Sequence, residues 1–216
     1  MRKIKFTTGE LYHIYNRGNN KRTIFSKPQD LNRFLQGMND FNTINPIGSL
    51  YLNSFRKELR GSTSKLVNFI CYCLNPNHFH FIVKQTAEEG ITKLMHRIGT
   101  GYTRYFNDQY ENSGSLFQGR FKANLIDSNK YLLHLSAYIN LNGDAHSLRG
   151  SASKLSISSW NEYIQGDEHK KNSLCNKKII LSQFKNLLEY KKFAEESLIN
   201  IKSRKEMLEL LEKDQI

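Results

Sequence analysis

The sequence predicts an α+β fold, in which a central, mostly antiparallel β-sheet carries helices and is followed by a helical C-terminal extension. Short runs rich in branched and aromatic residues alternate with longer segments whose apolar residues recur at helical spacing. Two of the strand-like runs, 66–74 and 78–84, are separated by only three residues, which is typical of an antiparallel hairpin. After Trp160 the composition changes to a Lys- and Glu-rich segment with helical patterns, which predicts the extension.

Local signals support each element in order. An aromatic and branched run from Leu11 ends at a tight turn that contains Gly18, and Pro28 suits the first turn of the helix that follows. The segment 75–77 interrupts the hairpin, and Ser128 can cap a later helix. The expected strands are 11–16, 66–74, 78–84 and one strand within 115–126. The expected helices are 28–42, 88–110 and 128–141, with 179–197 and 203–213 in the tail.

Length and composition bound the domain organisation. The 216 residues suffice for one domain with its own core, so we expect residues 1–160 to form the main domain and 161–216 an accessory helical segment. The odd number of cysteines argues against a secreted, disulfide-stapled protein. Neither a signal peptide nor a membrane-spanning run is evident, so we expect a soluble, cytoplasmic, nucleoid-associated protein without a membrane partner.

The charge distribution points to a polyanionic partner. The formal net charge is +12, and residues 167–216 contribute only 11 Lys/Arg against 9 Asp/Glu. Nearly all of the positive excess therefore lies in the first three-quarters of the chain, where a nucleic-acid backbone could bind with release of counterions. A basic protein without such a partner is the alternative interpretation.

His78 and His80 form the sharpest local feature, because residues two apart in a strand share a face. Phe79, Phe81 and Val83 would then occupy the opposite face. Two imidazoles side by side on an apolar strand are costly to bury unless a partner satisfies them, and a divalent metal ion is one such partner. Histidines that are hydrogen-bonded at the strand surface are the alternative.

A second feature lies on the helix expected at 128–141. His134, Tyr138 and Asn142 are spaced four residues apart and so fall along one stripe. A phenol beside a metal-bound phosphate is a competent nucleophile, because the cation neutralises charge on the phosphate. The amide of Asn142 could supply a neutral oxygen ligand to the same ion. Because Tyr138 lies among apolar residues, a tyrosine that only fills the core is the alternative.

Other patterns are less specific. Cys71 and Cys73, upstream of the histidine pair, lack the spacing of a zinc knuckle and are expected to be buried strand residues. Segments 102–107 and 116–122 interleave aromatic residues with cations, which suits stacking on single-stranded DNA as well as an ordinary aromatic core face. An octapeptide echo, LRGSTSKL and LRGSASKL, could bind phosphates through backbone amides or be coincidental. Its two copies lie at 59–66 and 148–155.

Four motifs occur in an order that resembles the REP-associated tyrosine transposases, a branch of the HUH single-tyrosine transposase superfamily. The resemblance covers about residues 9–160, and the ordered set is far more specific than any single motif. The motifs are YHIYNRGNN at 12–20, NPNHFHFIV at 75–83, LFQGRFK at 116–122 and YINLN at 138–142.

The resemblance implies a ferredoxin-like nuclease core that binds single-stranded DNA, often beside a hairpin. It implies His78 and His80 as paired ligands of Mg²⁺ or Mn²⁺ and Asn142 as the third ligand. Tyr138 would be the nucleophile that forms a 5′-phosphotyrosine and frees a 3′-hydroxyl. Relatives occur as dimers, so a homodimer is a further expectation. The expected DNA-binding residues are Arg17, Asn19, Lys21, Arg22, Arg97, Arg104, Arg120 and Lys122.

The sequence departs from the family pattern in one place. The family usually continues Asn-Pro-Val in this region, whereas Asn142 here is followed by Gly143. The geometry at this helix end is therefore open, and with it the identity of the third ligand. The alternative ligands are Asp144 and His146, and the alternative nucleophiles are Tyr131 and Tyr105.

Three hypotheses of function follow. The leading one is an enzyme that cuts and rejoins single-stranded DNA through a covalent tyrosine link. The first alternative is a DNA-binding protein of the same fold that has lost catalysis and binds structured single strands in a salt-sensitive way. The second is a metal-dependent phosphodiesterase in which water attacks. Only the leading hypothesis predicts DNA bound covalently to the protein.

Overall fold

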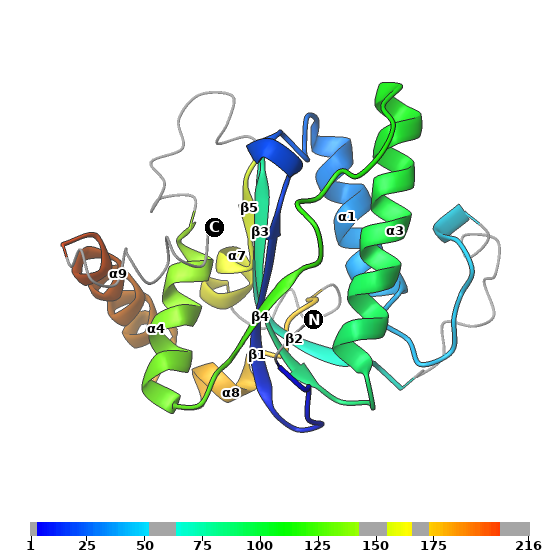
Figure 1. Ribbon diagram of the computed structural model, residues 1–216. Coiled ribbons are helices and arrows are strands. Elements are labelled where there is room, and N and C mark those ends of the chain that lie inside the picture. Colours follow the sequence, from blue (N-terminus) through cyan, green and yellow to red (C-terminus); the bar gives the residue numbers. More distant parts are fainter. Residues whose placement is uncertain (1–3, 52–63, 143–154, 166–172, 204–216) are drawn as a thin grey trace.

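A five-stranded sheet lies between two layers of helices in the computed structural model, which describes residues 4–51, 64–142, 155–165 and 173–203 (Figure 1). The strand order is β4-β1-β3-β2-β5, and every neighbouring pair is antiparallel. The strands are β1 Leu11–Arg17, β2 Val67–Asn75, β3 His78–Gln85, β4 Lys122–Leu125 and β5 Ile157–Ser158. The predicted α+β class is confirmed.

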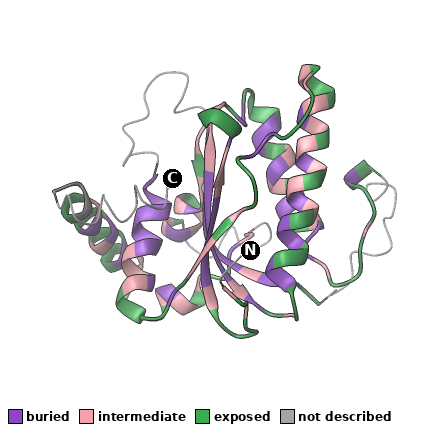
Figure 2. Cartoon of the chain, viewed as in Figure 1, coloured by how far each residue is buried: buried purple, intermediate pink, exposed green. Residues whose placement is uncertain are grey.

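The β2–β3 hairpin forms the centre of the sheet because both of its faces are apolar. On β3, Phe79 and Phe81 pack into one core and Ile82 packs into the other. Figure 2 shows buried residues running along these central strands, as expected for strands that are covered on both sides. At the turn, the Pro76 carbonyl accepts hydrogen bonds from the backbone N–H groups of Ile24 and Phe25.

Different helices cover the two faces (Figure 1). One face carries α1 Pro28–Asp40 and α3 Gly90–Tyr110. The opposite face carries α4 Asn129–Asn140, α7 Trp160–Ile164, α8 Lys178–Leu181 and α9 Leu187–Ser203. None of the helices in the described part of the chain combines the length and apolar composition needed to cross a bilayer.

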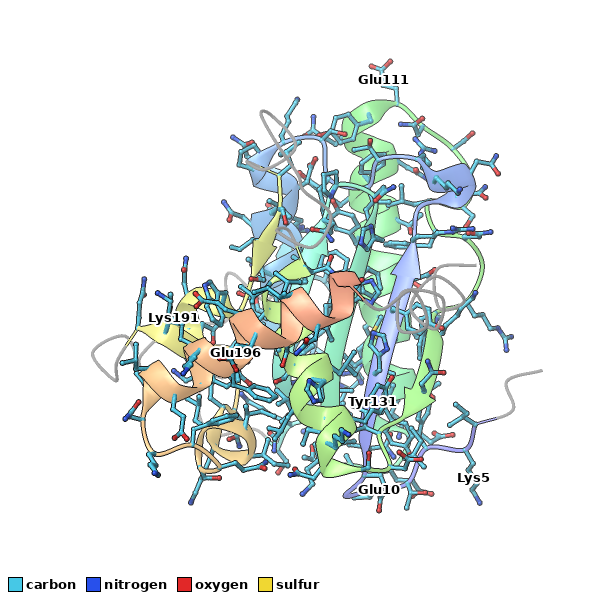
Figure 3. The ribbon with its side chains drawn as sticks, turned by 90° about the vertical axis from the view of Figure 1, so that its left-hand side faces the viewer. Lys5, Glu10, Glu111, Tyr131, Lys191 and Glu196 are labelled. Atoms are coloured by element: carbon cyan, nitrogen blue, oxygen red, sulfur yellow. The ribbon has the colours of Figure 1, made fainter. Side chains whose placement is uncertain are left out.

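The tail helix predicted at 179–197 is wrong in its boundaries, because α8 ends at Leu181 and α9 begins only at Leu187. The Asn186 side chain accepts from the Glu189 backbone N–H at 2.9 Å and so caps a new helix start. Figure 3 shows α9 crossing over α4, with Lys191 and Glu196 on α9. The second predicted tail helix lies outside the described residues beyond position 203, as do residues 59–63 and 148–154 of the two echo copies.

A short loop at the end of β1 packs on the turn of the central hairpin. It contains the 3-10 turn η1 Asn19–Lys21, in which Asn20 and Lys21 both have positive φ. The Gly18 N–H donates to the Asn77 carbonyl at 2.8 Å. A Cβ atom on Gly18 would lie 2.1 Å from the Arg22 carbonyl oxygen, so the close turn needs glycine.

Candidate active site

The two histidines of β3 lie on the sheet face that α4 covers. Strand alternation places Phe79 and Phe81 in the core below α1 and α3, so His78 and His80 face the other way, as predicted. His80 is only 3% exposed, whereas His78 at the start of the strand is half-buried. Their ring centroids are 5.3 Å apart, with the ring planes at 83°.

Tyr138 approaches the histidine pair from α4. Its ring stands edge-on to His80, with centroids 6.2 Å apart and planes at 81°, and Tyr138 is 3% exposed. The helix is held from its first turn, where the predicted cap Ser128 accepts from the Tyr131 N–H. The phenol therefore lies beside a ring of the histidine pair within one chain, without a contribution from a second subunit.

His80 is enclosed by two aromatic rings from β1. The His80 ring stacks on Tyr15 at 5.7 Å and on His13 at 5.2 Å between centroids. His13 Nε2 and His80 Nδ1 are 2.9 Å apart and share a hydrogen bond. His13 is fully buried, and this loss of hydration lowers its pKa to about 3, so the imidazole is neutral at physiological pH.

His78 belongs to a network of amides. The Asn77 Oδ1 atom lies 2.7 Å from His78 Nδ1, so the Nδ1–H donates to it. His78 Nε2 is then the accepting nitrogen, and it lies 2.9 Å from the Asn75 Nδ2 atom. The same Asn75 amide donates to Asn142 Oδ1, while Asn75 Oδ1 accepts from the Ser156 hydroxyl at 2.7 Å.

This arrangement fits a divalent cation. Lone pairs of His78 Nε2 and Asn142 Oδ1 converge on one electropositive atom, the Asn75 amide nitrogen, and a cation could take the place of that donor. His80 Nδ1 is hydrogen-bonded to His13, so Nε2 is the ring nitrogen of His80 that could coordinate the ion. The described parts of the chain contain no group of three His, Cys, Asp or Glu side chains that could hold a metal ion, so a third protein ligand from these parts would be a neutral oxygen such as that of Asn142.

Comparisons with known proteins identify the family. A family model described as Transposase IS200 like matches residues 9–142, which is more than half of the chain. The chain belongs to the IS200-like transposase family. The resemblance found in the four ordered motifs is thereby confirmed.

No curated protein matches the sequence of this transposase. Among solved structures, the transposase is similar to a REP-associated tyrosine transposase bound to a REP hairpin, with 12% sequence identity and a TM-score of 0.51. The alignment covers 81% of this chain and 88% of the other. At this level of identity the likeness shows a shared fold.

Two of the predicted DNA-binding cations of the transposase flank the histidines. In the sheet register Arg17 is opposite His78, and Lys122 is opposite Tyr15, which is itself opposite His80. Directly opposed residues share a face, so both cations are on the histidine side of the sheet. Lys122 is exposed, and the guanidinium of Arg17 donates to the Gln118 side chain.

The other predicted DNA contacts are more scattered. The Arg97 guanidinium donates to the carbonyls of residues 41, 43 and 44, and Arg22 stacks over Phe106 at 5.5 Å. Arg104 is exposed and lies with Arg120 along a cleft of about 760 Å³ beside α3, across the sheet from Tyr138. Asn19 and Lys21 are exposed in η1. Their DNA roles remain predictions.

The alternative nucleophiles, Tyr105 and Tyr131, both lie away from the histidine pair. Tyr105 lies on the opposite sheet face and donates to Asp30 at 2.9 Å; burial, and then this bond, raise its pKa to about 12. Tyr131 lies two helical turns from Tyr138, toward the start of α4 (Figure 3). The alternative ligands at positions 144 and 146 lie outside the described residues.

The predicted stripe on α4 does not hold along its whole length. His134 bonds to the Ser197 hydroxyl at 3.0 Å and packs on Phe193 of α9, whereas Tyr138 and Asn142 meet the central strands. One step of four residues turns the helix by about 40°, which carries His134 toward α9 and off the face that Tyr138 uses. His134 therefore belongs to the α4–α9 contact.

The cysteines are buried strand residues, as predicted. Cys71 and Cys73 are fully buried in the sheet. Burial raises the pKa of the Cys73 thiol to about 12 and that of Cys71 above its usual range. Thiols in this state are poor zinc ligands, because a metal binds the thiolate.

His13 and Asn75 lie within two of the four motifs, and no chemical role was predicted for either residue. Both are fully buried, and both contact the predicted ligands directly. The available signal was a polar side chain within an otherwise apolar strand, which needs a hydrogen-bond partner. The identity of that partner depends on how the strands pair across the sheet.

Proposed function

We propose that this transposase cuts and rejoins single-stranded DNA through a covalent bond between Tyr138 and a 5′-phosphate. The observation that carries the proposal is the approach of the Tyr138 ring to His80, at 6.2 Å between centroids, next to the convergent His78 and Asn142 side chains. A phenol, two imidazoles and an amide oxygen can supply the nucleophile and the metal ligands of a metal-assisted phosphoryl transfer. Structured DNA with a hairpin beside the cleavage position is the proposed substrate.

His78, His80 and Asn142 would hold a divalent cation, Mg²⁺ or Mn²⁺. When bound, the cation polarises the scissile phosphate and offsets its negative charge. The two histidine rings are held in orientation before DNA arrives, because Nδ1 of each is already hydrogen-bonded. Such fixed orientation reduces the reorganisation needed at the moment of reaction.

The chemical step is an in-line displacement at phosphorus. Tyr138 Oη loses its proton to solvent and bonds to the phosphorus atom, while the bond from phosphorus to the 3′-oxygen of the preceding nucleotide breaks. The departing oxygen takes up a proton and becomes a free 3′-hydroxyl. In the reverse direction, a 3′-hydroxyl of another strand attacks the phosphotyrosine and releases Tyr138, so strands are exchanged without an external energy source.

The surface beside the site supports a DNA substrate. Arg17 and Lys122 flank the histidines, and their charges favour a phosphate backbone. The similar solved transposase was bound to a REP hairpin, which supports a hairpin as substrate here. Because Tyr138 and His80 meet within one chain, the proposed chemistry does not depend on the homodimer expected from the relatives.

An adduct assay tests the proposal. Labelled single strands carrying a hairpin are mixed with the protein and Mg²⁺, Mn²⁺ or chelator, and label that remains on denatured protein is measured. We expect label with either metal, none with chelator, and none with Tyr138→Phe at unchanged DNA affinity. Tyr131→Phe is the matched control and should still form the adduct. Label on Tyr138→Phe contradicts the assignment of Tyr138 as the nucleophile. Binding without cleavage supports the catalytically silent DNA-binding protein instead, and cleavage without label supports attack by water.

A further inference from the structure

The side chain of His13 is the least expected polar group in the sheet. It lies on β1 between Tyr12 and Ile14, is fully buried, and contacts the predicted metal ligand His80 through its Nε2 atom at 2.9 Å. An imidazole without a partner is costly to bury in such a place compared with an apolar residue. The hydrogen bond to His80 offsets part of that cost, and its direction determines which nitrogen of His80 carries the proton.

Only one proton can occupy the hydrogen bond between two neutral imidazoles. If His80 Nδ1–H donates to His13 Nε2, the proton of His80 is on Nδ1 and its Nε2 keeps a lone pair for a cation. If His13 donates instead, Nε2 of His80 carries the proton and cannot coordinate. Metal-binding histidines usually donate their second ring N–H to a fixed acceptor, and His78 already does so to Asn77.

We propose that His13 is a positioning residue that accepts the Nδ1–H of His80 and thereby holds His80 in the tautomer that binds the cation. The inference rests on the proposed function, since it gives His80 the ligand role. The geometry adds a second restraint, because Tyr15 stacks on both imidazoles and fixes their ring planes. His13 thus does for His80 what Asn77 does for His78.

The tautomer can be read without metal, DNA or a variant of His13. In a long-range ¹H–¹⁵N correlation spectrum of the ¹⁵N-labelled, metal-free protein at neutral pH, protonated and unprotonated ring nitrogens have separate shifts. The His80 signals are assigned by their loss in His80→Gln. We expect Nδ1 of His80 to be protonated and Nε2 to be unprotonated. Protonation at Nε2 overturns the proposal.

Variants at position 13 test the consequence for metal binding. His13→Leu fills the space without an acceptor, and His13→Gln keeps an acceptor near the position of Nε2. Mn²⁺ affinity is measured from the electron paramagnetic resonance signal of the free ion, and His78→Ala defines the signal due to this site. We expect His13→Leu to weaken Mn²⁺ binding by about 10- to 100-fold and His13→Gln to recover most of that loss. His134→Leu, the same change at the α4–α9 contact, should bind as wild type does.

Equal Mn²⁺ affinity in wild type and His13→Leu overturns the proposal, as does an equal loss in the Leu and Gln variants. If His13→Leu does not fold, the tautomer measurement on the wild type decides. The adduct assay is scored separately. An Nδ1–H tautomer without any adduct contradicts the proposed function alone, whereas an adduct with Nε2–H at His80 contradicts the role of His13 alone.

Discussion

The side-chain amide of Asn140 donates to the hydroxyl of Tyr190 at 2.8 Å, which joins the end of α4 to α9. Asn140 lies two residues beyond Tyr138 and two before Asn142, so this bond restrains the helix end that presents both groups. Its Oδ1 atom also accepts from Ser159 at 2.6 Å. The tail segment of the chain is therefore structurally linked to the candidate site.

Replacing Tyr190 by Phe should reduce stability and slow adduct formation. The change leaves the buried Asn140 amide without this partner, at a cost of about 1–3 kcal/mol in the free energy of unfolding. It also loosens the helix end that carries Tyr138. Denaturant unfolding and the adduct rate measure the two effects. Leu188→Ala, at a side chain that is 73% exposed on the same helix, is the control and should change stability by less than about 0.5 kcal/mol.

The buried His13 predicts an acid-sensitive fold. Burial lowers the pKa of His13 from its ordinary value of 6.5 to about 3 in the folded protein. As the pH falls, the unfolded state therefore takes up a proton at a higher pH than the folded state does. The contribution of the neutral His13 to the free energy of unfolding is fully present above about pH 6.5 and is lost toward pH 3. Between these values the free energy of unfolding falls by up to about 1.4 kcal/mol per pH unit. The measurement is the free energy of unfolding of metal-free wild type and His13→Gln between pH 7 and pH 4. A difference between them that stays constant with pH would contradict the assignment.

Local sequence signals were sufficient for most of the fold. The period-two pattern of 78–84 predicted a strand with both histidines on one face, and Ser128 predicted the start of α4. The two-residue strand β5 was missed because it is too short to show any periodicity and forms only by pairing with β2. The break before α9 was missed although Asn186 and Glu189 form a recognisable cap.

The site was predicted less completely than the fold, for a physical reason. The i, i+4 spacing of Tyr138 and Asn142 is local, and both do face the central strands. The bond between His13 and His80 joins residues 67 apart and depends on the register of β1 against β3, which no local pattern encodes. The order of the motifs indicated Tyr138 and Asn142, but it gave no indication of the bond between His13 and His80.

A Cβ atom at position 18 should disturb the loop that packs on the hairpin turn. In Gly18→Ala this atom would lie 2.1 Å from the Arg22 carbonyl oxygen, so the backbone must shift. The shift strains the hydrogen bond from the N–H of residue 18 to the Asn77 carbonyl. We expect a loss of about 1–3 kcal/mol in the free energy of unfolding, measured with urea. Gly99→Ala is the control and should change stability in the opposite direction. Apart from its chain neighbours and the nearby backbone of α3, no atom lies within 4 Å of a Cβ at position 99, and removing a helical glycine should add up to about 1 kcal/mol.

Lys122 and Arg97 were both predicted to bind DNA, and their surroundings predict different outcomes. Lys122 is exposed on the histidine side of the sheet, so Lys122→Gln should lower the slope of log affinity against log salt by about one. The free energy of unfolding of Lys122→Gln should equal that of the wild type. Arg97 donates to three backbone carbonyls, so Arg97→Gln should cost about 1–2 kcal/mol of stability and leave the salt slope intact.

Hairpin-DNA titrations at several salt concentrations, combined with urea unfolding, separate these two roles. Unchanged salt dependence in Lys122→Gln would remove Lys122 from the DNA surface. A reduced slope with unaltered stability in Arg97→Gln would show that its carbonyl contacts give way to phosphate when DNA binds. In that case the DNA path would extend across α3, on the face opposite Tyr138, and the backbone of residues 41–44 would have to find other donors.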